Sequence, residues 1–237
     1  MDPAILIFNT ALEAAEACGD RILELLADAR NDRGIATVAV SGGSTPRLMF
    51  QSMAKRAFDW TAVEIFQVDE RAVPPDHDLS NFRMMRETLL SRITIDEPRI
   101  HRMRGELPPA EAAREYTDDI RRVFRLGEKE LPVFDVIQRG MGPDGHTASL
   151  FPGEPLIADR AGIVAALHSE KMKQDRITLL PGVLERARHT LCLVSGNDKA
   201  AALREVLKGA ADPMSFPSQI ALGKSIWYVD KAAAARL

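Results

Sequence analysis

Residues 132–153 have the sequence PVFDVIQRGMGPDGHTASLFPG, and this stretch decides both the fold class and the site. It begins with a short apolar run, Val133–Ile137, which is typical of a buried β-strand. Three glycines then surround Asp144 and His146, and glycines this dense let backbone N–H groups approach a ligand. An aspartate two residues before a histidine can hold the imidazole in one tautomer. The stretch therefore predicts a general base on a turn between a strand and a helix.

The same glycines match the GxGxxG fingerprint of dinucleotide-binding proteins at residues 140–145, with Glu170 at a tolerable distance for a ribose contact. Three observations argue against that function. The fingerprint opens a long crossover helix, whereas Pro152-Gly153 would end a helix here after about two turns. Asp144 would place a negative charge where the pyrophosphate lies, and the motif begins well past the middle of the chain. We therefore expect no dinucleotide cofactor.

Length and composition indicate an ordinary soluble globular protein. The chain has 237 residues, 46% hydrophobic and 27% charged, with no composition break that marks a linker, so we expect one α/β domain over residues 1–237. A net charge of −3 argues against nucleic acid or a membrane surface as partner. Cys18 and Cys192 form no CxxC motif, so no disulfide framework is expected. With no long apolar run, and no Lys or Arg before Arg21, we expect a cytoplasmic location.

Short apolar runs alternate with amphipathic segments along the chain. Strands are predicted for residues 4–8, 35–40, 63–68, 133–137, 190–194 and 226–229, and further apolar runs occupy residues 163–167 and 177–180. Helices are predicted for residues 12–29, 46–53, 80–90, 111–124 and 199–207, with an alanine-rich helical tail. This alternation predicts an α/β fold with a mostly parallel, Rossmann-like sheet and helices on both faces.

Four polar clusters each follow the end of a predicted strand. They are Ser41–Thr45, Asp69–Arg71, Asp144–His146 and Asn197–Lys199. The carboxyl ends of parallel strands meet at one edge of a sheet, and ligands bind there near a reversal of strand order. We therefore expect the four clusters to lie together.

The cluster Ser41–Thr45 offers consecutive backbone N–H groups, hydroxyls and a helix N-terminus, a combination that suits a phosphate. It lacks the GxxxxGK[ST] pattern, so a nucleoside triphosphate is not implied. An ordinary turn with a Ser/Thr helix cap would have the same residues. Lys199 adds a cation, or lies on a solvated helix face instead. Arg71 either clamps a phosphate or pairs with the two acids that precede it.

His146 differs from the other histidines because glycines and polar residues surround it. The other four are expected at the surface or satisfied within the core: His77, His101, His168 and His189. Asp69 is the second candidate acid or base. A metal bound by Asp69, Asp144 and His146 is possible in principle, but no pair has helix-type ligand spacing, so we expect no metal.

With these residues identified, the chain resembles the 6-phosphogluconolactonases, within a wider group that includes the glucosamine-6-phosphate deaminases. The resemblance covers nearly the whole chain. The segments that carry it are SGGSTPRLMF, QVDERAVPPDHDLSNFRMMRETLL, IHRMRGELPPAEAAREY, GMGPDGHTASLFPG, RITLL, LVSGNDKAAALREVLKG and IWYVD. The deaminases typically have Asp-Glu-Tyr where this chain has Asp69-Glu70-Arg71, and they continue differently after His146. Both differences favour the lactonases.

Two positions depart from the family pattern. Gln138-Arg139 stands where the family usually continues its apolar strand, and is expected to kink the strand end or to bring a guanidinium near the site. Leu180 stands where a threonine is common, so one hydroxyl contact with the substrate is not expected. Neither position touches the predicted base.

The resemblance implies hydrolysis of 6-phosphoglucono-δ-lactone, a phosphorylated cyclic ester of the oxidative pentose phosphate pathway. His146, held by Asp144, would take a proton from the attacking water, while glycine-turn N–H groups and Arg71 would stabilise the oxyanion. The implied substrate-binding residues are Gly42, Gly43, Ser44, Thr45, Asp69, Arg71, Arg176 and Lys199. No metal or organic cofactor is needed. The expected partner is the small phosphosugar lactone, without nucleic acid or membrane, bound by a monomer or a small homo-oligomer.

Two alternatives remain open. A deaminase or aldose-ketose isomerase acting on an amino-sugar phosphate would use Asp69 and His146 to move protons, and would release ammonia from glucosamine 6-phosphate. A non-catalytic sensor of sugar phosphates would bind its ligand without turnover. The intact Asp144–His146 pair argues against the sensor.

Overall fold

Within residues 3–237, which the computed structural model describes, a parallel sheet of seven strands forms the centre of the protein. In chain order its strands are β1 (Ala4–Phe8), β2 (Ala36–Val40), β3 (Val63–Gln67), β5 (Ile100–His101), β6 (Val136–Arg139), β9 (His189–Val194) and β10 (Ser225–Asp230). Across the sheet the order is β1-β10-β9-β6-β2-β3-β5, and every neighbouring pair is parallel. The predicted α/β fold with a mostly parallel sheet is confirmed.

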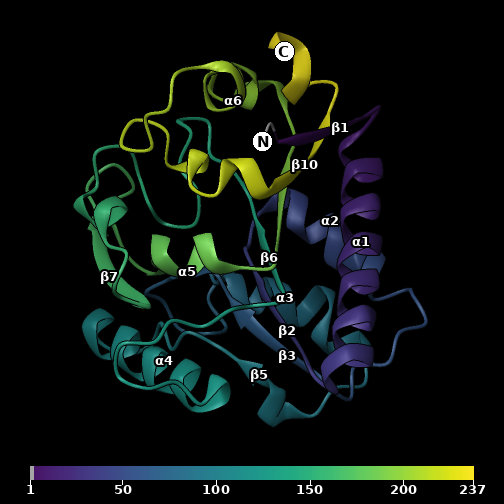
Figure 1. The fold of residues 1–237 in the computed structure, drawn as a ribbon, viewed down its shortest axis with the longest axis vertical. Helices are drawn as coiled ribbons and strands as arrows, with labels where there is room; N and C mark the ends of the chain where they lie inside the picture. The colour runs from purple at the N-terminus through teal and green to yellow at the C-terminus, as the bar shows by residue number, and fades with distance from the viewer. Residues whose placement is uncertain (1–2) are drawn as a thin grey trace.

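Helices cover both faces of this sheet (Figure 1). They are α1 (Ala11–Arg33), α2 (Ser44–Met53), α3 (Asn81–Thr88), α4 (Pro109–Phe124), α5 (Pro181–Arg186) and α6 (Ala200–Lys208). The first three pack on one face and the last three on the other. Because side chains alternate along a strand, Val38 and Ile65 join the core on the side of α1–α3, whereas Ala39 and Phe66 join the core on the side of α4. None of the helices in residues 3–237 is long and apolar enough to cross a membrane.

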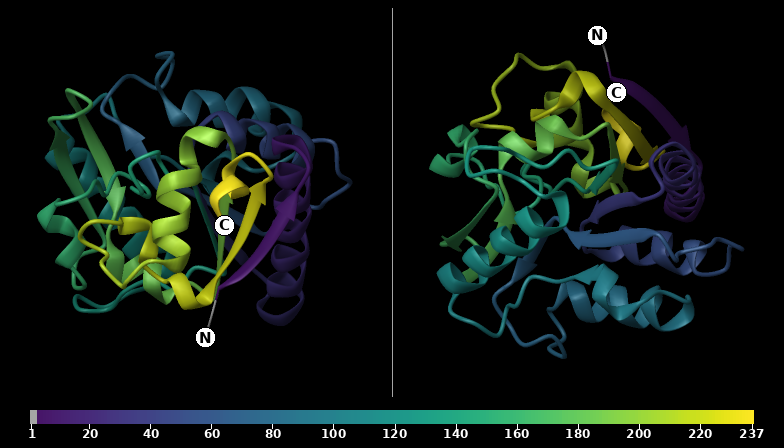
Figure 2. Two further views of the ribbon diagram at one scale, coloured as in Figure 1. Left: turned by 90° about the horizontal axis from the view of Figure 1, so that it is seen from above. Right: turned by 60° about the horizontal axis from the view of Figure 1, so that its bottom comes forward.

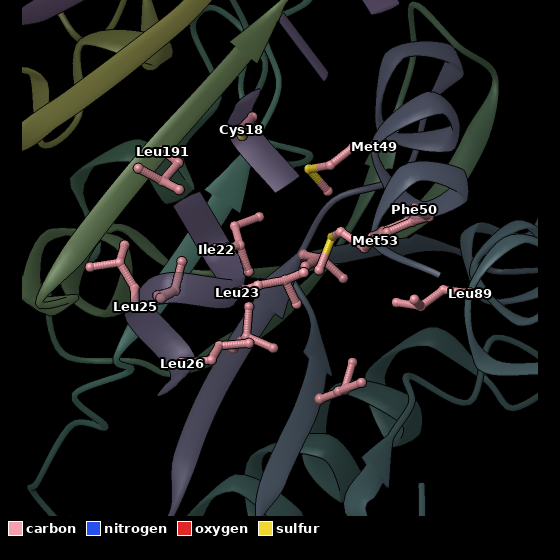
Figure 3. Packing of buried hydrophobic residues seen from close by; sticks show 14 of the residues in the cluster. Cys18, Ile22, Leu23, Leu25, Leu26, Met49, Phe50, Met53, Leu89 and Leu191 are labelled. Atoms are coloured by element: carbon pink, nitrogen blue, oxygen red, sulfur yellow. The ribbon is translucent and has the colours of Figure 1, made fainter. Parts of the chain in front are cut away.

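Much of the core on the first face comes from α1 and α2 (Figure 3). Ile22 and Leu26 of α1 join Met49 and Met53 of α2 in one buried cluster, and burial of each side chain stabilises the fold by roughly 1.5–3 kcal/mol. Gly19 lets the helices approach closely, since a Cβ there would lie 2.9 Å from Met53 Cγ. This packing fixes the position of α2, and with it the polar residues that follow β2.

A second, antiparallel sheet of three strands adds to the fold, in the order β4-β8-β7. Its strands are β4 (Asp69–Arg71), β7 (Val164–Ser169) and β8 (Gln174–Leu179). The two apolar runs at residues 163–167 and 177–180 are thus strands, but they pair with each other as a hairpin. Asp69–Arg71, which we expected to be only a polar cluster after a strand, is itself a strand paired with β8.

One edge of the large sheet is closed by β1 and β10, which lie side by side in purple and yellow (Figure 2). The register pairs Ala4 with Ile226 and Phe8 with Asp230. The backbone N–H of Lys231 also donates to the carbonyl of Phe8, 2.9 Å away. Two segments from opposite ends of the described chain are therefore joined by backbone hydrogen bonds.

The turn after β6 differs from the prediction. Residues 140–153 all belong to the described chain and contain no helix, so the predicted turn between a strand and a helix is wrong. Gly145 has a φ of 82° and Ala148 a φ of 51°, values that do not occur in a right-handed helix. The next helical residues form a 3₁₀ turn at Pro155–Ala158. A dinucleotide-binding fingerprint would begin a crossover helix. The glycines at residues 140–145 begin no such helix.

The other predicted elements are confirmed with boundaries that differ by a few residues. The strand predicted at 133–137 is β6, which begins at Val136, and the helix predicted from residue 46 begins at Ser44. The alanine-rich tail is a 3₁₀ turn at Ala233–Arg236. The structure also contains α5, which the sequence analysis did not predict. It begins with Pro181-Gly182, the two residue types with the lowest helix propensity.

His101 is buried between two carboxylates. Its Nδ1 lies 2.6 Å from Asp119 Oδ2, its Nε2 lies 2.8 Å from Glu64 Oε2, and its ring stacks on Phe66 with centroids 4.1 Å apart. Burial opposes the charged form, but the hydrogen bonds with Asp119 and Glu64 outweigh it and raise the pKa of His101 above its ordinary value. The prediction that this histidine is satisfied within the fold is confirmed.

Replacing His101 with glutamine is expected to destabilise the protein more near pH 6 than near pH 9. A raised folded-state pKa contributes stability that is fully present below the unfolded value of about 6.5 and is lost as the pH rises through the folded pKa. The free energy of unfolding should fall by roughly 1.5–3 kcal/mol near pH 6, the size of a hydrogen bond to a charged group. Urea unfolding of both proteins across this range measures the effect. A loss that is equal at every pH would show that the charge on His101 contributes nothing.

Candidate active site

A cavity of about 280 Å³ opens at the carboxyl ends of β2, β3, β6 and β9. Its walls include members of all four predicted clusters, namely Ser41–Thr45, Asp69, Arg71, His146 and Lys199. The cavity lies where the strand order reverses, between β2 and β6. The prediction that these clusters meet at one edge of the sheet is confirmed.

The imidazole of His146 is oriented by Asp144. Nδ1 lies 2.5 Å from Asp144 Oδ1, which also accepts the backbone N–H of His146 at 3.2 Å. Because Nδ1 donates to the carboxylate, Nε2 keeps a free lone pair. The glycine at position 142 is required by this arrangement, since a Cβ on Gly142 would lie 2.0 Å from His146 Cε1. The ring also contacts Phe151, with centroids 4.7 Å apart.

Backbone hydrogen bonds hold the turn that carries His146. The N–H of Gly142 donates to the carbonyl of His146 at 2.9 Å, and the Ser218 hydroxyl donates to the same carbonyl at 3.0 Å. The N–H of Ser218 donates to the carbonyl of Gly145, 2.9 Å away. These hydrogen bonds hold the turn against Ser218, which lies 72 residues after His146 in the sequence.

Asp144 has a second partner that the sequence did not indicate. Lys171, between β7 and β8, donates from Nζ to Asp144 Oδ2 at 2.5 Å, so each carboxylate oxygen has its own partner. Burial opposes ionisation of Asp144, but the hydrogen bonds from His146 and Lys171 outweigh it and hold its pKa well below the ordinary value. The Asp144 carboxylate therefore stays ionised near neutral pH.

The residues after β2 form an open cradle at the N-terminus of α2. Gly43 is the residue before the helix, with a φ of 128°, and within residues 3–237 no side chain caps the free N–H groups there. The alternative of a simple Ser/Thr cap is therefore wrong. A Cβ on Gly42 would lie 1.8 Å from Asn81 Oδ1, so the backbone approaches α3 as closely as glycine allows. Thr45 Oγ1 lies 2.5 Å from Ser195 Oγ, which links the cradle to the segment after β9.

Arg71 does not pair with the acids that precede it. Its guanidinium donates to the carbonyl of Leu79 at 2.9 Å and to the side chain of Asn81. Glu70 instead caps α3, since its carboxylate accepts the N–H groups of Asn81 and Phe82, each at 2.7 Å. The alternative that Asp69–Arg71 forms a surface loop held by salt bridges is therefore wrong. Arg71 faces the cavity instead.

Arg176 lies directly opposite Arg71 in the pairing of β8 with β4, and both line the cavity. Arg176 is only 5% exposed, and its Nε has no hydrogen-bond partner in the described structure. Burial, reinforced by the nearby Arg71, lowers the pKa of Arg176 from its usual value. An anion between the two guanidinium groups would relieve both effects. Nearby, Asp69 accepts a hydrogen bond from the Ser149 hydroxyl at 2.8 Å.

Lys199 reaches the cavity from the 3₁₀ turn that precedes α6. Its ammonium pairs with its neighbour Asp198, whose side chain is 62% exposed, whereas the Lys199 side chain is only 22% exposed. The lysine is therefore turned inward rather than lying on a solvated helix face. An ion pair with so exposed a partner is weak and leaves the ammonium available to a ligand.

The two departures from the family pattern lie outside the cavity lining. The Arg139 side chain is fully buried and donates to the carbonyls of Ser218 and Ile220, so it neither kinks β6 nor enters the cavity. Leu180 is buried and packs beside Gly162. Over residues 3–237, no group of three His, Cys, Asp or Glu side chains is arranged to hold a metal ion.

Sequence reasoning missed several contributors to the site, among them Asn81, Ser149 and Lys171. Asn81 follows the predicted helix cap Ser80 and lies in a segment that carries the family resemblance, but neither fact points to its contact with Arg71. Ser149 comes three residues after His146, within the quoted motif, but its partner Asp69 is 80 residues away. Lys171 lies in a hairpin that was not predicted, and nothing in the sequence points to its contact with Asp144.

Comparison with known proteins identifies the family. The model described as Glucosamine-6-phosphate isomerases/6-phosphogluconolactonase matches residues 9–227. The 6-phosphogluconolactonase of Synechocystis sp. is 35% identical over 87% of this chain and 86% of the relative. The human 6-phosphogluconolactonase is 42% identical over 70% of this chain and 65% of the relative. The 6-phosphogluconolactonase structure from Thermotoga maritima has a TM-score of 0.84 and 29% identity over 97% of this chain and 100% of that one. The chain therefore belongs to the family of glucosamine-6-phosphate isomerases and 6-phosphogluconolactonases.

Proposed function

We propose that this protein hydrolyses 6-phosphoglucono-δ-lactone to 6-phosphogluconate, with His146 as the general base. One observation carries the proposal: an imidazole bonded to a carboxylate lines the same cavity as Arg71, Arg176 and Lys199. A phosphorylated lactone has an electrophilic carbonyl and a dianion, and this cavity offers a complementary group for each. The names of the relatives support the choice of this substrate.

The contact between Asp144 and His146 supports the role of base. Nδ1 is committed to Asp144, so Nε2 can take a proton from water as the water oxygen attacks the lactone carbonyl carbon. The carbonyl oxygen becomes an oxyanion, for which Arg71 is the proposed donor, because the N–H groups of Gly142 and Gly145 already donate within the turn. When the ring C–O bond breaks, the imidazolium returns the proton to the leaving ring oxygen, which becomes a hydroxyl. The new carboxylic acid then ionises in solvent, and His146 is neutral again.

The phosphate is proposed to bind on the cradle Gly42–Thr45. The N-terminus of α2 offers free N–H groups there, and a helix N-terminus attracts an anion. Lys199 and Arg176 would add charge-assisted hydrogen bonds. Asp69 is proposed to accept hydrogen bonds from sugar hydroxyls, because its carboxylate lines the cavity and Ser149 is the only described side chain bonded to it.

The decisive experiment is a direct assay of lactone opening. Proton release from freshly prepared 6-phosphoglucono-δ-lactone should greatly exceed the spontaneous rate when the protein is added. Ammonia release from glucosamine 6-phosphate is measured in parallel and should be absent. Ammonia release without lactone opening would favour the deaminase, and tight binding of 6-phosphogluconate without any turnover would favour the sensor.

Lactone opening is expected to survive exhaustive chelation. The proposed mechanism needs one base and an anion-binding cradle, and no described cluster has the ligand spacing of a metal site. Turnover after dialysis against EDTA should stay within about twofold of the untreated rate, since chelation removes no group that the mechanism uses. Loss of activity that a single divalent cation restores would overturn the metal-independent mechanism.

A further inference from the structure

We infer that Lys171, in the β7–β8 hairpin, is a positioning residue for the Asp144–His146 pair and keeps His146 in its neutral, proton-accepting form. This inference rests on the proposed function of His146. Lys171 lies in the turn between β7 and β8 of the second sheet, outside the turn at residues 140–146 that carries His146. It also lies outside the segments that carry the family resemblance.

The geometry divides the two oxygens of Asp144 between two donors. Oδ1 accepts from the His146 ring at 2.5 Å, and Oδ2 accepts from Lys171 Nζ at 2.5 Å. With both oxygens engaged, the carboxylate cannot rotate away from the imidazole. The same hairpin places Met172 in the wall of the cavity, so the lysine contact also fixes part of that wall.

The ammonium has an electrostatic effect with a definite sign. A carboxylate that already neutralises a lysine stabilises a neighbouring imidazolium less, and the ammonium itself repels that cation. Lys171 therefore disfavours protonation of His146. Without Lys171, Asp144 would act on His146 alone and the imidazolium would persist to higher pH. The Lys171 side chain is 61% exposed but that of Asp144 is only 18% exposed, so the pair adds little stability and acts mainly on the base.

Other charged groups surround the pair from each neighbouring element. Those in the cavity wall are Asp69, Arg71, Arg176 and Lys199. Those bordering the two hollows on the outer side of Asp144 are Glu154, His168, Glu170, Arg204, Glu205 and Arg236. Among all described side chains, however, only those of His146 and Lys171 donate a hydrogen bond to Asp144. The lysine contact is thus the direct one, while the others contribute a background field.

The test is the pH profile of kcat/KM for the lactone in Lys171→Met. Its acid limb should move to higher pH by roughly half a unit, the size expected for one partly exposed charge. Well above that limb, kcat/KM should change less than about threefold, because the base is then neutral with or without the lysine. Lys171→Arg should restore the wild-type profile. High salt should shift the wild type toward the variant and should move Lys171→Met less, because the Lys171–Asp144 pair is exposed to screening.

Lys173→Met is the matched control, since it removes the same charge two residues away on the same hairpin. An NMR titration of the His146 ring protons in each variant supplies a readout that is independent of activity. If the wild type does not open the lactone, the proposed function fails, yet this titration still tests the contact. Equal titration of His146 in wild type and Lys171→Met would overturn the inference. So would an equal shift in Lys173→Met, which would mean that a general field acts rather than the contact.

Discussion

Replacing His146 with alanine is expected to lower kcat by roughly 10²- to 10⁴-fold, with little change in KM, which is the usual effect of removing a positioned general base. The expectation follows from the geometry around Nε2, because Asp144 holds the ring through Nδ1 and the ring lines the cavity. The phosphate cradle lies on other elements, so substrate binding should persist. Residual turnover would come from positioning and from the oxyanion donor.

Steady-state kinetics corrected for spontaneous opening measure this loss. His189→Ala is the matched control, since His189 is an exposed residue at the amino end of β9, opposite the end that lines the cavity. It should leave kcat unchanged. Near-normal turnover in His146→Ala would exclude His146 as the base and direct attention to Asp69.

Lys199→Ala is expected to lower kcat/KM for the phosphorylated lactone by roughly ten- to a hundredfold, from a lost contact of about 1.5–3 kcal/mol. Lys199 and Ser44 are 155 residues apart in sequence (199 − 44), yet both line one cavity. If both hold the phosphate, the variant should hydrolyse unphosphorylated gluconolactone almost as fast as the wild type does. The selectivity between the two substrates is therefore the diagnostic result.

Two further variants sharpen this test. Ser44→Ala should show the same selectivity more weakly, and the double variant should lose less than the sum of the two effects, because residues that share one ligand group are coupled. Lys208→Ala removes an exposed lysine from the last turn of α6 and should change neither substrate. Equal losses on both substrates in Lys199→Ala would mean that Lys199 acts on the lactone itself or on folding. No loss on either would exclude a role for Lys199 in binding.

Much of the fold and the centre of the site could be predicted from the local sequence. Continuous apolar runs such as β2 and β3 are buried on both faces, so their pattern predicts a parallel sheet directly. The positions of Ser44, His146 and Lys199 follow from the same argument, because each comes just after a strand of that sheet. The edge at which they meet was therefore predictable without knowing a single side-chain contact.

What the sequence did not predict depends on contacts between distant segments. Asp69–Arg71 is too short and too polar to suggest a strand, and it becomes one only because β8 pairs with it. The glycine turn suggested a helix because an open turn and a helix start share the same residues. Lys171 reaches Asp144 across 27 residues of sequence, and no periodicity encodes such a contact.

The pairing of β1 with β10 has a consequence for biosynthesis. Ala4 pairs in the sheet with Ile226, which is synthesised 222 residues later (226 − 4). A contact this distant closes late in folding, because the entropy of the intervening chain opposes it until the rest is packed. During translation, β1 is meanwhile an uncharged segment, AILIF, rich in β-branched and aromatic residues. Such a strand is prone to pair with another nascent chain. β1 is thus exposed to misassembly until β10 has been made and has packed beside it.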